Sequence, residues 1–427
     1  MPPAAADQPT DAERRTIARW VERGVFGADP ARPDPGRVTV RRLNRIEYRN
    51  TIRDLTGFTF KVEDELPPDD TGYGFDNIGD VLTLSPMLLE KYIQAAEKIT
   101  TAAVPRVSRA PAEIAYTGSD FARSEGKGSG DRLSFYQAAT VTRSLDAPHD
   151  GSYRLLFDLE VLGQFDFDPG RCRVVLKADD QEIWQQEFGW QNGKKFSFDV
   201  PQQWTAGARR LTFELTPLLA MEKKVNSIDL RIASVRVRGP MEEARWVRPK
   251  NFDLFFSRDV PETGPERRAY AREVLQRFAR RACRRPVDDR YVDRLTDIAT
   301  AAAARPGMRF ADGIAQALVP LLASPRFLFR IEAATAAAPD DRFPLIDEHA
   351  LAARLSYFLW ATTPDSELSA LADRGELRRN LGAQVKRLLA DKRSEALVEN
   401  FVGQWLQVRD VEGIDINARI VLARDRG

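Results

Sequence analysis

Hydrophobic positions along the chain change their period twice, from helical spacing to alternation and back to helical spacing. In the stretch LNRIEYRNTIRDLTG, apolar residues recur every three or four positions, and Asn44 and Glu47 have the spacing of a capping box. These signals predict a helix from about Asn44 to Thr56. A second helix is predicted to begin at Ser85-Pro86, where serine can cap free amides and proline fits the first turn.

From Tyr116 to Gly239 the apolar residues alternate in short runs that turn-forming residues separate, which is typical of β-strands. Two dipeptides have the composition of hairpin turns: Asp179-Asp180 and Asn192-Gly193. Strands this short and this regularly spaced predict an antiparallel β-sandwich of the jelly-roll kind.

After Pro249 the helical spacing returns. Helices are predicted at Asp312 to Leu322, His349 to Trp360, Asp365 to Arg374, Leu377 to Ala390 and Ser394 to Val408. In the last of these, Phe401, Trp405 and Val408 are expected to pack inward. An arginine-rich run precedes these helices, and we interpret it as a solvated face paired with the aspartates that follow it: Asp288, Asp289, Asp293 and Asp297.

The fold class that follows is multidomain α plus β, with a helical N-terminal domain, an antiparallel β-sandwich and helical C-terminal domains. The pattern and a Pro-rich stretch divide the chain into these parts: a terminal helix (1–27), a linker (28–36), a helical domain (37–105), the sandwich (113–240), two helical domains (262–332 and 343–412) and a tail (413–427).

Charge and composition exclude several classes of protein. The 64 basic and 63 acidic side chains give a net charge of +1, which argues against a nucleic-acid partner. No run approaches the roughly 20 apolar residues of a membrane span, and the first residues lack the pattern of a signal peptide. Cys172 and Cys283 are expected to be buried free thiols, with a long-range disulfide as the alternative. The two histidines, His149 and His349, leave little for a zinc site or a catalytic triad.

Two clusters of carboxylates could ligate calcium. The first is the loop DDTGYGFDN with Asp69, Asp70 and Asp76, and the second is the segment FDFDPG with Asp166 and Asp168. Local turns, in which these side chains accept from main-chain amides, explain both clusters without a metal, and both alternatives stay open here.

Trp184, Trp190 and Trp204 are candidate carbohydrate-binding residues, because flat indole faces can stack on sugar rings. The alternative is packing, since a sandwich normally places at least one tryptophan in its core. Nucleotide-binding, hydrolase and zinc-protease motifs do not occur in the sequence, so no catalytic residue is assigned.

Three stretches carry a family resemblance. RVTVRRLNRIEYRNTIRDLTG with LPPDDTGYGFDNIGDVLTLSPMLLEKYIQAAEKI, RRACRRPVDDRYVDRL with LVPLLASPRFLFRIE, and PLIDEHALAARLSYFLWATTPDSELSALADRGEL with VENFVGQWLQVRDV resemble domains of unknown function 1587, 1595 and 1592 respectively. Such domains are typical of large planctomycete proteins that are often linked to c-type cytochrome domains. The helical domains of that family have no assigned activity.

The resemblance implies further expectations. The β-rich interval is similar in place and pattern to calcium-dependent xylan-binding modules, which implies Asp166 and Asp168 as metal ligands. PTDAERRTIARWVERGVFG resembles the closing helix of a cytochrome domain, but CxxCH is absent, so covalent haem is not expected. The family continues beyond Asp410, so we interpret the chain as a fragment with a truncated tail. Its parent protein is expected to be extracytoplasmic, in the periplasm or at the cell surface.

These observations lead to one hypothesis and two alternatives. The hypothesis is an extracytoplasmic, polysaccharide-associated protein whose sandwich binds a xylan-like glycan, with calcium as a candidate cofactor and a c-type cytochrome domain as a candidate partner. The first alternative is an enzyme that acts on polysaccharide or is coupled to a cytochrome. The second is a structural protein of envelope assembly.

Overall fold

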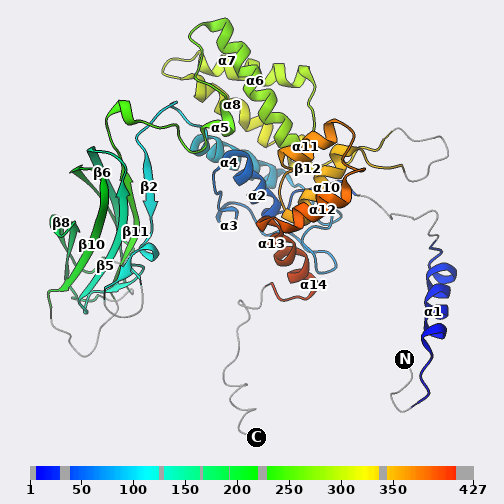
Figure 1. Ribbon diagram of the computed structural model, residues 1–427, viewed down its shortest axis with the longest axis horizontal. Helices are drawn as coiled ribbons and strands as arrows, with labels where there is room; N and C mark the ends of the chain where they lie inside the picture. Colours follow the sequence, from blue (N-terminus) through cyan, green and yellow to red (C-terminus); the bar gives the residue numbers. More distant parts are fainter. Residues whose placement is uncertain are drawn as a thin grey trace. The chain divides into compact units, whose positions relative to one another are not determined.

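The computed structural model describes residues 6–28, 39–124, 129–163, 167–191, 193–219, 228–335 and 344–409. The chain divides into two compact units, which Figure 1 shows as a helical part and a β part. The helical unit contains Met1–Arg106 and Asn251–Gly427, and the sandwich unit contains Val107–Lys250. The β part is therefore inserted between two segments of the helical unit.

The first segment of the helical unit contains the helices that the sequence predicts. They are α1 (Asp11–Trp20), followed by the π-helix Val21–Val25, α2 (Arg45–Thr56) and α4 (Pro86–Ala103). A short helix that was not predicted, α3 (Val62–Glu65), lies between α2 and α4. The predicted capping box of α2 is confirmed, because Asn44 accepts from the amide of Glu47 and Glu47 accepts from the amide of Asn44. Gly57 ends α2 with a left-handed φ of 71°. The predicted Ser85 cap of α4 is also confirmed.

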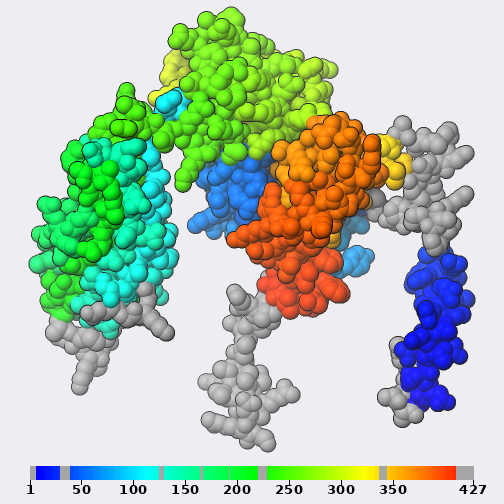
Figure 2. Space-filling model, viewed as in Figure 1, coloured from blue at the N-terminus to red at the C-terminus, as the bar shows by residue number. Residues whose placement is uncertain are grey.

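The second segment contains α5 (Phe252–Phe255), α6 (Gly264–Cys283), α7 (Asp289–Ala303), α8 (Phe310–Leu322), α9 (Pro325–Leu328), α10 (Glu348–Trp360), α11 (Ser366–Asp373) and α12 (Leu381–Ala390). The predicted last helix runs without interruption through α13 (Glu395–Leu397), the π-helix Val398–Val402 and α14 (Gly403–Trp405), after the 3₁₀ turn Lys392–Ser394. The predicted inward packing there is wrong: Phe401, Trp405 and Val408 are 41%, 65% and 51% exposed. In Figure 2 this red segment lies at the surface of the helical unit.

One hydrophobic core joins the two segments of the helical unit. The strands β1 (Arg41–Arg42) and β12 (Phe329–Arg330) pair antiparallel, although the whole sandwich unit separates them in sequence. Tyr48 packs its fully buried ring against Tyr92 of the same segment and Phe327 of the other. The segments 37–105 and 262–332 therefore share a core, and α10, α11 and α12 add a smaller cluster around Trp360.

The sandwich unit consists of two antiparallel sheets. One sheet has the order β3-β5-β10-β7-β8, and the other has the order β2-β11-β6-β9 with β4 also paired to β11. The strands are β2 (Glu113–Tyr116), β3 (Ala122–Arg123), β4 (Leu133–Ser134), β5 (Ala139–Ala147), β6 (Gly151–Leu162), β7 (Cys172–Ala178), β8 (Gln181–Phe188), β9 (Lys195–Trp204), β10 (Gly207–Pro217) and β11 (Asp229–Arg238). Inward-facing side chains of both sheets form one core, as alternation predicts.

The two predicted turns have different outcomes. Asp179 and Asp180 join β7 to β8 with left-handed φ values of 49° and 69°, as a two-residue hairpin requires. The hairpin predicted at Asn192-Gly193 is wrong, because the segment after β8 leads to β9 in the other sheet. Asn192 itself lies outside the described residues.

Both cysteines are buried free thiols, which confirms the prediction made from the sequence. Cys172 lies in the sandwich unit and Cys283 in the helical unit. Burial raises the pKa of Cys172 to about 12 and the pKa of Cys283 to about 11. Neither thiol is therefore ionised near neutral pH, which argues against a nucleophilic role for both.

Candidate functional site

Aromatic and carboxylate side chains meet at one end of the sandwich. The end is the one where β6 and β8 finish and β7 and β9 begin. Three separate loops contribute to it: the loop after β4 supplies Tyr136, the loop after β6 supplies Phe167 and Asp168, and the segment after β8 supplies Trp190. The sandwich topology therefore brings together side chains that lie up to 54 residues apart in sequence.

Phe167 and Trp190 form an aromatic pair at this end. Their ring centroids lie 5.7 Å apart with an interplanar angle of 69°, an edge-to-face arrangement. Trp190 is half-buried and packs against the core of the sandwich, whereas Phe167 is 71% exposed. The pair thus has one ring anchored on the core and one ring open to solvent.

Asp168 and Tyr136 fix the loop that carries Phe167. Asp168 is fully buried, and its Oδ1 accepts hydrogen bonds from the hydroxyl of Tyr136 and, at 2.8 Å, from the amide of Gly170. Burial, together with the hydrogen bond to Asp168, raises the pKa of Tyr136, so the phenol stays protonated as a donor. A side chain at Gly170 would collide with the Tyr136 hydroxyl. The carboxylate of Asp168 therefore fixes the backbone next to Phe167.

The other two candidate tryptophans lie against the core. The ring of Trp184 on β8 packs between the edge strands, with centroids 5.0 Å from Phe157 and 4.5 Å from Phe198. Trp204 at the end of β9 is 7% exposed and lies 5.0 Å from Tyr153. Of the three, Trp190 is the one that the structure places beside an exposed aromatic ring.

The Asp69 to Asn77 loop is held mainly by ion pairs and caps. Asp69 accepts from Arg42 and from the amide of Arg45, both at 2.6 Å. Burial is the main cause that raises the pKa of Asp69, and these two partners oppose it. Asp70 is exposed.

Asp76 joins this loop to residues at the far end of the chain. It accepts from the side-chain amide of Asn44 at 2.9 Å and from Arg409 at 2.6 Å, and its own amide donates to Gln404 at 2.8 Å. Across the described parts of the chain, no group of three His, Cys, Asp or Glu side chains is arranged to hold a metal ion. Asp166 lies outside the described residues, so its role as a ligand stays a prediction.

Sequence reasoning missed Phe167 and Tyr136. The FDFDPG segment does contain a signal, because alternation points Phe167 away from the side of its neighbours Asp166 and Asp168. Attention to the carboxylates as metal ligands hid the aromatic residue between them. The partner Trp190 comes from another loop, so the pair could not be found from local sequence.

Family models match three segments of the chain. Residues 41–105 match PSD3, a protein of unknown function (DUF1587); residues 270–332 match PSD5, a protein of unknown function (DUF1595); and residues 346–423 match PSD4, a protein of unknown function (DUF1592). These matches confirm the resemblance of the three helical segments. Among curated proteins, nothing matches the chain.

Solved structures with similarity include dimeric latent PorU from Porphyromonas gingivalis, at 13% identity over 31% of this chain and 13% of that chain, with a TM-score of 0.22. A CBM36-1 domain of a multidomain xylanase from the hindgut metagenome of Trinervitermes trinervoides has 13% identity over 30% of this chain and 98% of its own, with a TM-score of 0.21. A carbohydrate-binding module CBM36 in complex with calcium and xylotriose has 9% identity over 29% and 98%, with a TM-score of 0.20. Within the described helices, none is long and apolar enough to cross a membrane.

Proposed function

We propose that the sandwich unit binds glycan at the end formed by Phe167 and Trp190, with a xylan-like polysaccharide as the candidate ligand. The observation that carries this proposal is the aromatic pair, in which Phe167 stays 71% exposed beside the anchored ring of Trp190. Sugar rings present faces of C–H groups, and a flat aromatic surface buries those faces from water. The exposed ring of Phe167 offers such a face, and its edge-to-face contact with Trp190 holds it in position.

Charged side chains beside the pair supply hydrogen-bonding groups for sugar hydroxyls. Arg171 packs beside Gly189, the residue before Trp190, and pairs with Glu187 at 2.8 Å. Both side chains of this pair are more than one-third exposed, so a hydroxyl can reach them. An aromatic platform edged by a few polar groups is the usual composition of a small-molecule site.

The proposed glycan site does not require a calcium ion. The described residues supply one buried carboxylate, Asp168, whose Oδ1 already holds the loop through Tyr136 and Gly170. On their own these residues do not fit a calcium ion, so the proposal for glycan does not depend on one. Titration with calcium and then with a chelator tests the calcium dependence that Asp166 and Asp168 predict.

The enzyme alternative would be favoured by two neighbouring acids without cationic partners. Three acids line a cavity beside α6 and α11, and each has a partner: Asp54 pairs with Arg53 at 2.8 Å, Asp365 with Arg387 at 2.7 Å, and Asp373 with Arg280. This arrangement gives no support to hydrolysis by paired carboxylates. An extracytoplasmic parent protein, and a cytochrome partner for it, stay proposals that rest on the sequence resemblance.

Retention on insoluble xylan tests the proposal with the full chain. Trp190→Ala and Phe167→Ala are each expected to lower affinity about tenfold, because an aromatic contact of about 1.4 kcal/mol is lost. The matched control is Trp405→Ala, which removes a 65% exposed tryptophan of the helical unit and should change nothing. Unchanged retention of both sandwich variants would overturn the proposal. If neither the wild type nor any variant is retained, a protein-contact role would be favoured instead.

A further inference from the structure

Arginines line a cavity of about 800 Å³ in the helical unit. Most of its wall is formed by the C-terminal half of α6, by α11, and by the segment that joins α10 to α11. Six of the lining residues are arginines and three are aspartates: Arg277, Arg280, Arg281, Arg284, Arg285, Arg393, Asp54, Asp365 and Asp373. The volume lies within the range of about 300–1,000 Å³ that is usual for small-molecule sites.

The arginines of α6 fall on two faces with different partners. On the first face, Arg268 pairs with Asp297 at 2.7 Å, and Arg272 pairs with aspartates of α7 at 2.6 and 2.8 Å. This face confirms the solvated pairing that the sequence predicts. On the second face, Arg277, Arg281 and Arg284 follow at spacings of four and three residues, so they lie on one side of the helix.

This second face keeps its positive charge. Among the described residues, Arg277, Arg281 and Arg284 form no ion pair, and their guanidinium groups donate to main-chain carbonyls. Arg277 donates to the main-chain carbonyl of Phe255 at 2.6 Å, and Arg281 donates to the main-chain carbonyl of Asp54 at 3.0 Å. A carbonyl dipole orients a cation but does not neutralise it. Burial, and then the charge of Arg277, lower the pKa of Arg281.

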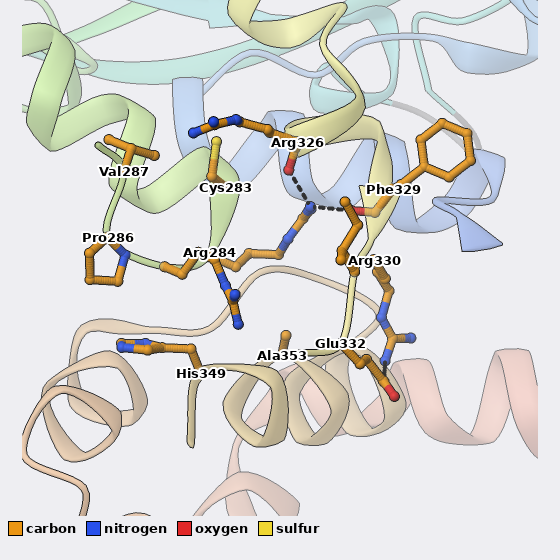
Figure 3. Close-up of a pocket in the computed structure, with 12 residues that line it drawn as sticks. Cys283, Arg284, Pro286, Val287, Arg326, Phe329, Arg330, Glu332, His349 and Ala353 are labelled. Carbon is orange, nitrogen blue, oxygen red and sulfur yellow. Dashed lines mark hydrogen bonds and ion pairs between the residues drawn. The ribbon is translucent and has the colours of Figure 1, made fainter. Parts of the chain in front are cut away.

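Arg284 shows how firmly these side chains are held. It ends α6 with a left-handed φ of 61° and donates to the carbonyls of Phe327 and Phe329, both at 2.8 Å. Figure 3 shows Arg284 reaching the strand that carries Phe329, in a smaller pocket of about 270 Å³. His349, also drawn there, lines both this pocket and the larger cavity. The two spaces therefore share a wall of preorganised cationic groups.

The three aspartates of the wall only partly offset the charge of the six arginines, and two of them pair with arginines outside the cavity. Asp54 accepts from Arg53 and, at 2.8 Å, from Thr362, and Asp365 accepts from Arg387 and caps α11. Neither Arg53 nor Arg387 lines the cavity. Asp373 is the exception, because it pairs with Arg280, which does line the cavity.

We propose that this cavity binds a small anion with two or more carboxylate or phosphate groups, through Arg277, Arg280 and Arg281. Guanidinium groups match both oxyanions with paired N–H donors, so carboxylate and phosphate share the recognition chemistry. The ligand supplies the counter-charge that α6 lacks on this face. Ser366 and Ser369 also line the cavity and provide hydroxyl donors.

Calorimetric titration of the full chain at constant ionic strength tests the proposal, with citrate and pyrophosphate as probes and chloride as the reference anion. Binding of citrate only assigns carboxylate, binding of pyrophosphate only assigns phosphate, and binding of both assigns the shared chemistry. No binding of either probe below millimolar concentration overturns the proposal.

Two opposite variants and one control locate the site. Arg280→Gln removes a cation that is 41% exposed and should lower affinity at least tenfold. Arg272→Gln makes the same change on the other face of α6, at 35% exposure, and should leave affinity unchanged. Asp373→Asn removes the acid that competes for Arg280 and should raise affinity several-fold.

The Asp373→Asn result separates binding from folding, because a variant that is merely destabilised does not bind more tightly. An unchanged or lower affinity in Asp373→Asn, or an equal loss in Arg272→Gln and Arg280→Gln, contradicts the assignment. The unfolding temperature of each variant without ligand shows that the comparison is made between folded proteins.

Discussion

The arginines of the cavity in the helical unit are partnered differently from the arginines on the strands of the sandwich. In the sandwich they pair with carboxylates on neighbouring strands, as Arg154 does with Asp199 at 2.5 Å and Arg238 with Glu113 at 2.6 Å. In the helical unit, Arg277 and Arg281 reach inward to carbonyls and keep their charge. The regular register of a sheet places opposite charges side by side. The helical unit concentrates positive charge in a cavity.

The largest expected difference between the units concerns a buried ion pair. Glu47 is 5% exposed and accepts from Arg41 through both oxygens, at 2.7 and 2.8 Å. Glu47→Ala leaves Arg41 buried without its partner and should destabilise the helical unit by about 3–5 kcal/mol. Glu187→Ala breaks exposed pairs in the sandwich and should leave the free energy of unfolding almost unchanged, because water already screens these charges. Denaturant unfolding, followed by far-ultraviolet circular dichroism, measures the free energy of unfolding of both variants. An equal loss of stability in the two variants would contradict the distinction.

A second contrast lies within the sandwich. Trp184→Ala removes a ring that packs on Phe157 and Phe198, and it should destabilise the sandwich by about 3 kcal/mol. Trp190→Ala should cost less stability but more glycan affinity. Thermal unfolding and xylan retention, measured on both variants, separate packing from recognition. A Trp184→Ala variant with normal stability would show that this ring is not part of the core.

Acid should weaken the helical unit through its buried carboxylate, Glu47. Burial raises the pKa of Glu47, but the charge and hydrogen bonds of Arg41 outweigh it and hold the pKa below the ordinary 4.5. A lowered pKa means that the carboxylate contributes stability above pH 4.5, and that this stability is lost as the pH falls through the folded-state pKa. The slope is at most about 1.4 kcal/mol per pH unit for one proton. Glu47→Gln should flatten it, and identical acid slopes would contradict this account.

Local signals predicted local structure well. The capping box at Asn44 and the Asp179-Asp180 hairpin depend on neighbouring residues, so the sequence contains all that determines them. The order of helices and strands follows from the two hydrophobic periods. The shared core of the helical unit was beyond reach, because β1 pairs with a strand that lies beyond the inserted sandwich.

The candidate sites were less predictable, for a physical reason. Whether Trp184 or Trp190 faces the core depends on which edge strands meet, and the sequence does not specify that pairing. The arginine-rich run of α6 was visible, but the cavity exists because α11 lies over one of its faces. The expected burial of Phe401 and Trp405 failed because the last helix contains the π-helical turn Val398–Val402, which departs from the 3.6-residue period assumed for the stripe, and both rings are exposed.

Calorimetric titration of the full chain with xylohexaose, with calcium and then with a chelator, tests the central claim most directly. We expect saturable binding in the wild type that Trp190→Ala loses, and calcium dependence would assign a role to Asp166 and Asp168. Binding that persists in Trp190→Ala, or no binding of the wild type with or without calcium, would contradict a glycan site at the Phe167 and Trp190 pair.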